Sequence, residues 1–184
     1  MPVQIGATTH SFTEPTGLLS DCHRRVEMFL GSLMAVAERA DGMLTEETRR
    51  ALEQSLRYFR EAAPKHTADE EESLFPRMRA YQDDRVQGAL QKLKSLEEDH
   101  RWAEPLHAAA EDMGNEYLRE GHLSAEKVDQ FRNAVKRLVE MYRRHIEVED
   151  REIFPVAAEA LTAKDKAEIA REMAERRGLS PMGS

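Results

Sequence analysis

Apolar residues recur along most of the chain at alternating steps of three and four, which is the period of an amphipathic α-helix. Clusters of turn-forming residues interrupt this pattern at 40–43, 81–84, 120–124 and 161–165. Thr45 and Ser124 are expected to cap the helices that follow them, because acidic residues occupy the next turn. The pattern thus predicts four long helices and a short fifth, over residues 16–39, 45–80, 85–119, 124–160 and 164–177.

Four long helices with one apolar stripe each and short connections favour an up-down-up-down bundle. The predicted fold class is therefore all-α, a four-helix bundle with a short fifth helix near the C-terminus. The 184 residues are expected to form one domain. Its bundle would cover about residues 13–160, after an N-terminal arm at 1–12 and before a C-terminal helix and tail at 162–184. The fifth helix is expected to pack outside the bundle or against a partner.

Composition and charge argue against several classes of function. There are 35 acidic and 27 basic residues, and the formal net charge of −8 disfavours nucleic acid and anionic lipid as partners. Cys22 is the only cysteine, so a bound metal would need nitrogen and oxygen ligands. No apolar run approaches the roughly 18 residues of a membrane span, and no targeting signal is recognisable at the N-terminus. We expect a cytoplasmic protein.

A histidine interrupts the apolar stripe of each long helix, and an acid follows it four residues later. Residues i and i+4 lie one turn apart on the same face of a helix, so each pair can present two donor groups together. The number of residues from each histidine to the next turn nearly equals the number from that turn to the next histidine, which places all four at one height. The pairs are His23/Glu27, His66/Glu70, His100/Glu104 and His145/Glu149.

Four imidazoles and up to four carboxylates are thus expected to converge inside the bundle. An ionised carboxylate in an apolar core is costly unless it is paired or bound to a cation, so this convergence predicts a metal centre. Nitrogen and oxygen donors suit iron, manganese or zinc, and up to eight donors suit two bridged ions better than one. Ferritin-like di-metal bundles use Glu-x-x-His instead, a spacing that only Glu97/His100 has here.

Two stretches of eleven residues, "HTADEEESLFP" from His66 and "HIEVEDREIFP" from His145, agree as H-x-x-x-E-[ED]-x-x-[LI]-F-P. Together with "EPTGLLSDCHRR" and "EEDH", they make residues 13–160 resemble the hemerythrin-like family, whose members have HHE cation-binding domains. The resemblance implies a four-helix bundle around a non-haem centre of two iron ions, bridged by oxo or hydroxo and carboxylate groups. The ligands that it implies in this chain are His23, His66, Glu70, His100, His145 and Glu149.

Two further acids complete the set of eight predicted ligands. Glu104 falls where the oxygen carriers of the family have a histidine, and Pro105 disfavours helical geometry at Glu104. Glu27 is suggested by the internal repeat. The choice of bridging carboxylate stays open, because Asp150, five residues after His145, is an alternative to Glu149.

Several neighbouring residues are interpreted as structural. Cys22 is expected to be a small buried group, and His107 a core residue or a group lining an access channel. The prolines that end the two repeated stretches are expected to kink or end their helices. The side chains expected to form core walls or to pack below the site are Trp102, Tyr142, Leu74, Phe75, Ile153 and Phe154.

The expected function is di-iron binding with O2, peroxide or NO as the small ligand, in sensing, redox chemistry or iron homeostasis. Oxygen carriage is disfavoured, because extra anionic donors stabilise ferric iron. One alternative is a di-iron enzyme that consumes peroxide or oxygen, and another is an iron-storage or iron-sensing protein. A signalling role would need a partner that the sequence does not identify, and the fifth helix is a possible homodimer contact.

Overall fold

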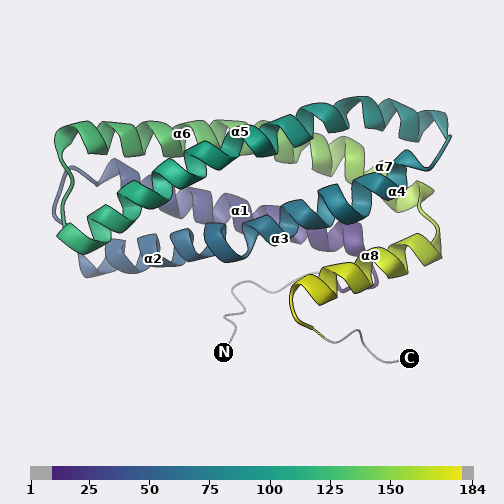
Figure 1. The fold of residues 1–184 in the computed structure, drawn as a ribbon, viewed down its shortest axis with the longest axis horizontal. Helices are drawn as coiled ribbons and strands as arrows, with labels where there is room; N and C mark the ends of the chain where they lie inside the picture. Colours follow the sequence, from purple (N-terminus) through teal and green to yellow (C-terminus); the bar gives the residue numbers. More distant parts are fainter. Residues whose placement is uncertain (1–9, 180–184) are drawn as a thin grey trace. The chain divides into compact units, whose positions relative to one another are not determined.

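The computed structural model describes residues 10–179, and every regular element in that range is helical (Figure 1). The predicted all-α fold class is confirmed, and each predicted helix end lies within one residue of the observed end. Most of the predicted N-terminal arm and C-terminal tail lies outside the described residues. The elements, with η for a π-helical turn, are α1 (Pro15–Glu38), α2 (Glu46–Glu61), α3 (Ala63–Ala68), η1 (Asp69–Leu74), α4 (Phe75–Arg79), α5 (Asp84–Glu120), α6 (Ala125–Val148), η2 (Glu149–Ile153), α7 (Phe154–Ala160) and α8 (Ala163–Arg176).

Side-chain caps begin α2, α6 and α8. Thr45 and Thr48 form a reciprocal capping box at α2, in which each side chain accepts a hydrogen bond from the backbone N–H of the other. At α6 the Ser124 hydroxyl accepts a hydrogen bond from the Lys127 N–H at 3.4 Å. Thr162 caps α8, where its hydroxyl accepts from the Asp165 N–H at 3.1 Å. These bonds satisfy backbone donors that have no partner within a helix.

Two π-helical turns interrupt the α-helical register within the repeated stretches. The backbone N–H of Phe75 donates to the Glu70 carbonyl, and that of Phe154 donates to the Glu149 carbonyl, five residues earlier in each case. A proline follows each phenylalanine, and in a regular α-helix its ring would clash with the carbonyl four residues before it. The wider turn relieves this clash, so the chain remains helical on both sides of each proline.

The chain divides into two compact units, and each is made of segments from distant parts of the sequence. The first unit comprises residues 1–25, 64–97 and 146–184, and the second comprises residues 26–63 and 98–145. Helices α1 and α5 each contribute residues to both units. The assignment of the whole chain to one domain stays a prediction.

The core of the first unit combines residues from its helical segments with two from α8, Ile169 and Met173. Burial of these side chains supplies the main favourable free energy of the unit. The other buried members of the cluster are Leu18, Leu19, Leu74, Phe75, Met78, Val86, Ala89, Leu93, Leu96, Ile153, Phe154, Ala157 and Leu161. The expectation that Leu74, Phe75, Ile153 and Phe154 are core side chains is therefore confirmed.

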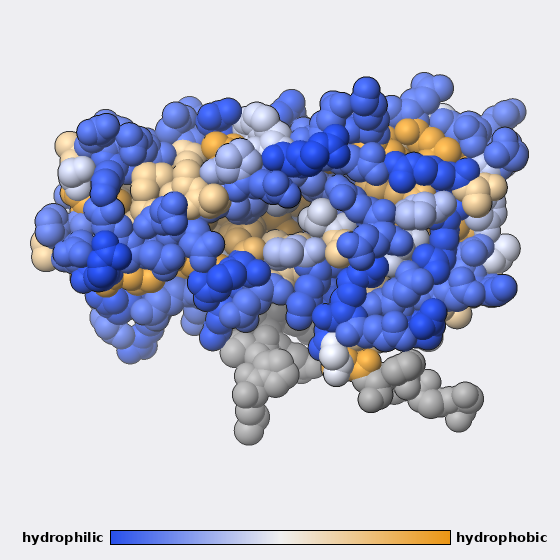
Figure 2. All heavy atoms as spheres, viewed as in Figure 1, coloured by the Kyte–Doolittle hydropathy of each residue, from blue (hydrophilic) through white to orange (hydrophobic). Residues whose placement is uncertain are grey.

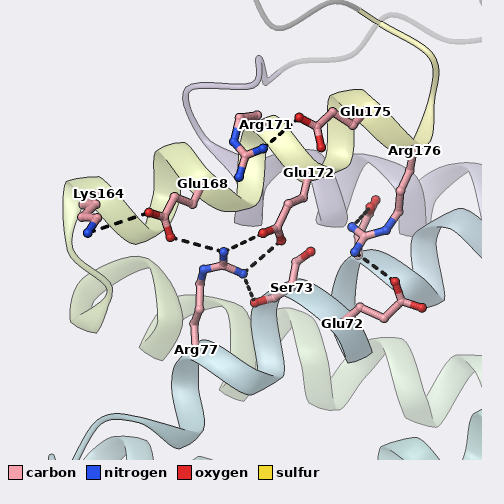
Figure 3. Close-up of polar contacts among 10 residues, drawn as sticks. Glu72, Ser73, Arg77, Lys164, Glu168, Arg171, Glu172, Glu175 and Arg176 are labelled. Carbon is pink, nitrogen blue, oxygen red and sulfur yellow. Dashed lines mark hydrogen bonds and ion pairs between the residues drawn. The ribbon is translucent and has the colours of Figure 1, made fainter.

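Polar contacts hold α8 against η1 and α4 (Figure 3). Arg77 donates to the Ser73 carbonyl at 2.9 Å and to a Glu172 carboxylate oxygen at 2.7 Å. The Asp69 carboxylate is fully buried and accepts from Arg176 at 3.0 Å and from Arg177 at 2.6 Å. The fifth helix therefore packs against its own chain, through both apolar side chains and ion pairs.

The second unit has its own buried residues, including Leu52 and Leu56 of α2. Gly114 of α5 lies against them, since a Cβ atom at Gly114 would come within 2.9 Å of the Leu56 Cδ1. The Tyr117 hydroxyl donates to the Gly42 carbonyl at 3.1 Å. Close approach of α5 to α2 therefore depends on the missing side chain at Gly114.

Hydrophilic residues cover most of the face in Figure 2, and apolar residues appear there only as small separate areas. Within residues 10–179, no helix combines the length and the apolar character that crossing a bilayer requires.

Candidate metal centre

Two histidines and two glutamates from four helical elements meet inside the first unit. His23 comes from α1, His66 from α3, Glu70 from η1 and Glu149 from η2. The His23 Nε2 lies 3.1 Å from the Glu149 Oε2 and 3.7 Å from the Glu70 Oε1, and the His66 Nε2 lies 3.1 Å from the same Glu70 oxygen. One donor atom each from His23, His66 and Glu70 lies within 4.8 Å of the others, a spacing that could hold a metal ion.

Burial gives this group its electrostatic character. Glu70 and Glu149 have 0 % of their surface exposed. Burial lowers the pKa of His23, but contacts with the carboxylates of Asp150, Glu149 and Glu70 outweigh it and raise the pKa well above its ordinary value. The group therefore favours a positive charge among its carboxylates, which a proton or a metal cation would supply.

Asp150 lies on the other side of the His23 ring from Glu149. Its Oδ1 is 2.9 Å from the His23 Nδ1 and accepts a hydrogen bond from the Ser20 hydroxyl at 2.7 Å. Burial raises the pKa of Asp150, but His23, Ser20 and Arg24 outweigh that effect and lower it below its ordinary value. Of the two acids between which the sequence left the choice open, Glu149 faces the Nε2 side and Asp150 faces the Nδ1 side.

The second unit brings two further predicted ligands together. The Nε2 atoms of His100 and His145 are 3.0 Å apart, and both residues are buried. Two imidazole nitrogens bound to one ion at about 2.1 Å and at a right angle would lie about 3.0 Å apart, so this pair suits a shared metal. The His145 Nδ1 lies 3.4 Å from the Asp99 Oδ2.

Glu27 and Glu104, the other two predicted ligands, have exposed side chains, so the structure does not bring them into either group. They lie in the regular α-helices α1 and α5, where a residue at i+4 is rotated about 40° from residue i. Glu70 and Glu149 instead lie in π-helical turns, in which each residue advances less around the helix axis. The two buried acids thus lie in π-helical turns, and the short H-x-x-x-E stretches have no such turn.

The interpretations of the neighbouring aromatic residues have mixed outcomes. Trp102 is 40 % exposed, with the Arg137 guanidinium 4.8 Å from its ring centre, so the prediction of a core wall was wrong. His107 is packed beside Phe59, its Nε2 is 3.0 Å from the Tyr142 hydroxyl, and burial lowers its pKa to about 4. His107 is therefore neutral at neutral pH and partly buried. Cys22 is buried, as expected.

Phe154 has a role at the site that the sequence did not indicate. Its ring stacks on His23, with centroids 5.1 Å apart and planes inclined by 17°. It belongs to the repeated [LI]-F-P ending, which was interpreted as packing only. The repeated ending could have drawn attention to Phe154. Its contact with His23 could not be predicted from it, because the two residues lie far apart in the sequence.

An all-helical fold that gathers imidazoles and buried carboxylates in this way defines a class of helical metal-binding proteins. Residues 14–157 match the family model of the hemerythrin HHE cation binding domain, and the chain belongs to that family. It is also similar to a protein of Haemophilus influenzae described only as uncharacterized, with 29 % identity over 168 residues. That match covers 91 % of this chain and 92 % of the relative. The family and the His/Glu groups are both consistent with metal binding.

Proposed function

We propose that the protein binds two iron ions, with manganese or zinc as alternative metals, through six of the eight predicted ligands. The observation that carries the proposal is the burial of two carboxylates, Glu70 and Glu149, beside two histidines of the first unit. Such carboxylates are stabilised when they bind a cation. The six proposed ligands are His23, His66, Glu70, His100, His145 and Glu149.

The spacing along the sequence predicts one metal centre for these six residues. His145 lies in α6 and Glu149 begins η2 four residues later, so one continuous helical segment carries a ligand from each group. The similar residue counts between each histidine and the intervening turns predict a common height for all four histidines.

Iron in such a site supplies electron exchange and open coordination positions for O2, peroxide or NO. The six proposed ligands would leave positions open for a small ligand, since Glu27 and Glu104 are exposed. Phe154 covers one face of His23 and limits the access of water there. We propose that this binding serves sensing, redox chemistry or iron homeostasis in the cytoplasm.

Metal analysis combined with absorbance spectra tests the proposal. The purified protein should hold about two iron ions per chain, and its spectrum should change on reduction and on exposure to O2 or NO. The variant His66→Ala should lose metal and these changes, whereas His122→Ala, at an exposed histidine in a turn, should keep both. Less than one ion per chain after anaerobic loading with iron would rule out the proposed centre.

A further inference from the structure

We propose that Asp150 is a positioning residue, which holds the His23 ring so that its Nε2 faces the metal. This inference rests on the proposed metal centre and deepens it, because it assigns a task to a carboxylate that is not one of the six ligands. It also gives separate tasks to two consecutive acids of one sequence stretch, Glu149 and Asp150.

The contacts on the two ring nitrogens of His23 carry the inference. Its Nδ1 lies 2.9 Å from the Asp150 carboxylate, while its Nε2 lies 3.1 Å from the Glu149 carboxylate and 3.7 Å from that of Glu70. Only Nε2 therefore faces other proposed ligands. His23 is buried, whereas the Asp150 side chain is 31 % exposed, as a residue at the edge of the site would be.

A neutral imidazole carries one proton, and a metal binds the nitrogen that lacks it. A carboxylate that accepts the Nδ1 proton fixes this tautomer, leaves the Nε2 lone pair for the metal and makes the imidazole a stronger donor. Asp150 is the group that contacts Nδ1, so it selects the nitrogen that binds. Without it, the ring would lose its preferred tautomer and part of its orientation.

Asp150 is itself held in place from two sides. The Ser20 hydroxyl, one turn before His23 on α1, donates to the same Asp150 oxygen that lies beside His23. Arg24 provides a favourable positive charge nearby. Ser20, His23 and Asp150 thus link α1 to η2, and the contact that orients the imidazole also fixes the turn that carries Glu149.

The second unit contains a similar contact with a longer distance between its atoms. The Asp99 carboxylate lies 3.4 Å from the His145 Nδ1, and the His145 Nε2 faces the His100 Nε2 at 3.0 Å. His23 and His145 thus each have a carboxylate at Nδ1 and another proposed ligand at Nε2. The shorter distance and the second hydrogen bond from Ser20 make Asp150 the stronger case.

The test measures Zn²⁺ affinity by competition with a chelator, because Zn²⁺ is diamagnetic and has no redox chemistry. Asp150→Ala should weaken binding by about 10–100-fold, the usual effect of removing a partner of a metal-binding histidine. The matched control is Glu152→Ala on the same turn, where an exposed pair with Lys92 is lost and the affinity should not change. Ser20→Ala should give a smaller loss than Asp150→Ala, and this milder variant keeps the test valid if Asp150→Ala folds poorly.

Ring ¹⁵N spectra of His23 provide a readout that a purely structural role would not move. In the Zn²⁺-loaded wild type and in Glu152→Ala, Nδ1 should be protonated and Nε2 metal-bound. In Asp150→Ala this pattern should be lost or mixed. If Asp150→Ala keeps the Zn²⁺ affinity and the ring pattern of the wild type, the positioning role is overturned and the proposed function is not. If the wild type itself binds neither Zn²⁺ nor iron, the proposed function is overturned.

Discussion

In the first unit two histidines share their site with fully buried carboxylates, whereas in the second unit two histidines face each other at 3.0 Å. Each unit contains one complete pair of a histidine followed by an acid four residues later, His66/Glu70 in the first and His100/Glu104 in the second. The outcomes differ: Glu70 lies in a π-helical turn and is fully buried, whereas Glu104 lies in regular α-helix and is exposed. The same spacing therefore occurs with a buried acid in a π-helical turn and with an exposed acid in a regular α-helix.

The largest expected effect separates the buried acids from the exposed ones. Glu70→Ala should weaken iron binding by more than about 100-fold, because the loss of a group outside the ligand shell already costs about 10–100-fold. Glu27→Ala and Glu104→Ala should leave the affinity unchanged. Chelator competition on the three variants checks this difference. Equal losses in all three would mean that the exposed acids turn inward to bind metal.

A loss of stability should follow when the buried Asp69 is deprived of both arginines. Arg176→Ala combined with Arg177→Ala leaves a fully buried carboxylate without its two ion-pair partners, and should cost about 3 kcal/mol of unfolding free energy. Arg171→Ala on the same helix removes an exposed pair with Glu175 and should cost less than about 0.5 kcal/mol. Urea unfolding of the metal-free variants measures both values. A double variant as stable as Arg171→Ala would show that α8 is held mainly by apolar contacts.

The second unit should show a pH dependence that originates from His107. Because its pKa is lowered to about 4 in the folded state, the unfolded chain binds a proton first as the pH falls below about 6.5. Stability relative to His107→Leu should therefore fall between about pH 6.5 and pH 4, by at most about 3 kcal/mol, and stay level outside this window. Denaturation at a series of pH values gives the difference. A constant difference would place His107 in contact with water. The pKa of His23 in the first unit is shifted in the opposite direction. Because the wild type and His107→Leu both contain His23, its contribution cancels in the difference between them.

The smallest expected effect concerns the helix caps of the two units. Thr45→Ala removes the capping box of α2 in the second unit, and Thr162→Ala removes the cap of α8 in the first unit. Each should cost about 1 kcal/mol, because a backbone N–H loses its partner. Glu53→Ala, at an exposed position of α2, is the control and should change stability by less than about 0.5 kcal/mol. Thermal unfolding shows the changes, and a Thr45→Ala variant that matches the control would mean that water replaces the cap.

Much of the fold could be predicted from local features of the sequence. Apolar periodicity and turn-forming residues are properties of neighbouring positions, and they place the ends of the five predicted helices within one residue of the observed ends, but not the breaks inside the second and fourth of them. Spacing also identified the four histidines and the buried acids Glu70 and Glu149 as candidates. Four of the proposed ligands of the first unit, His23, His66, Glu70 and Glu149, are among the residues that the structure brings together.

The tertiary structure decided which acids face the histidines and which contacts orient them. The His23 to Asp150 contact joins residues 127 positions apart, and the Asp69 to Arg177 pair joins residues 108 positions apart. Sequence spacing on one helix does not determine such contacts, because they depend on how separate segments pack. The same limit applies to the register change before Pro76 and Pro155, since a proline can kink a helix, end it or be accommodated by a π-helical turn. The sequence by itself thus determined the helices and the donor types, whereas packing assigned Glu149 and Asp150 to opposite sides of one imidazole.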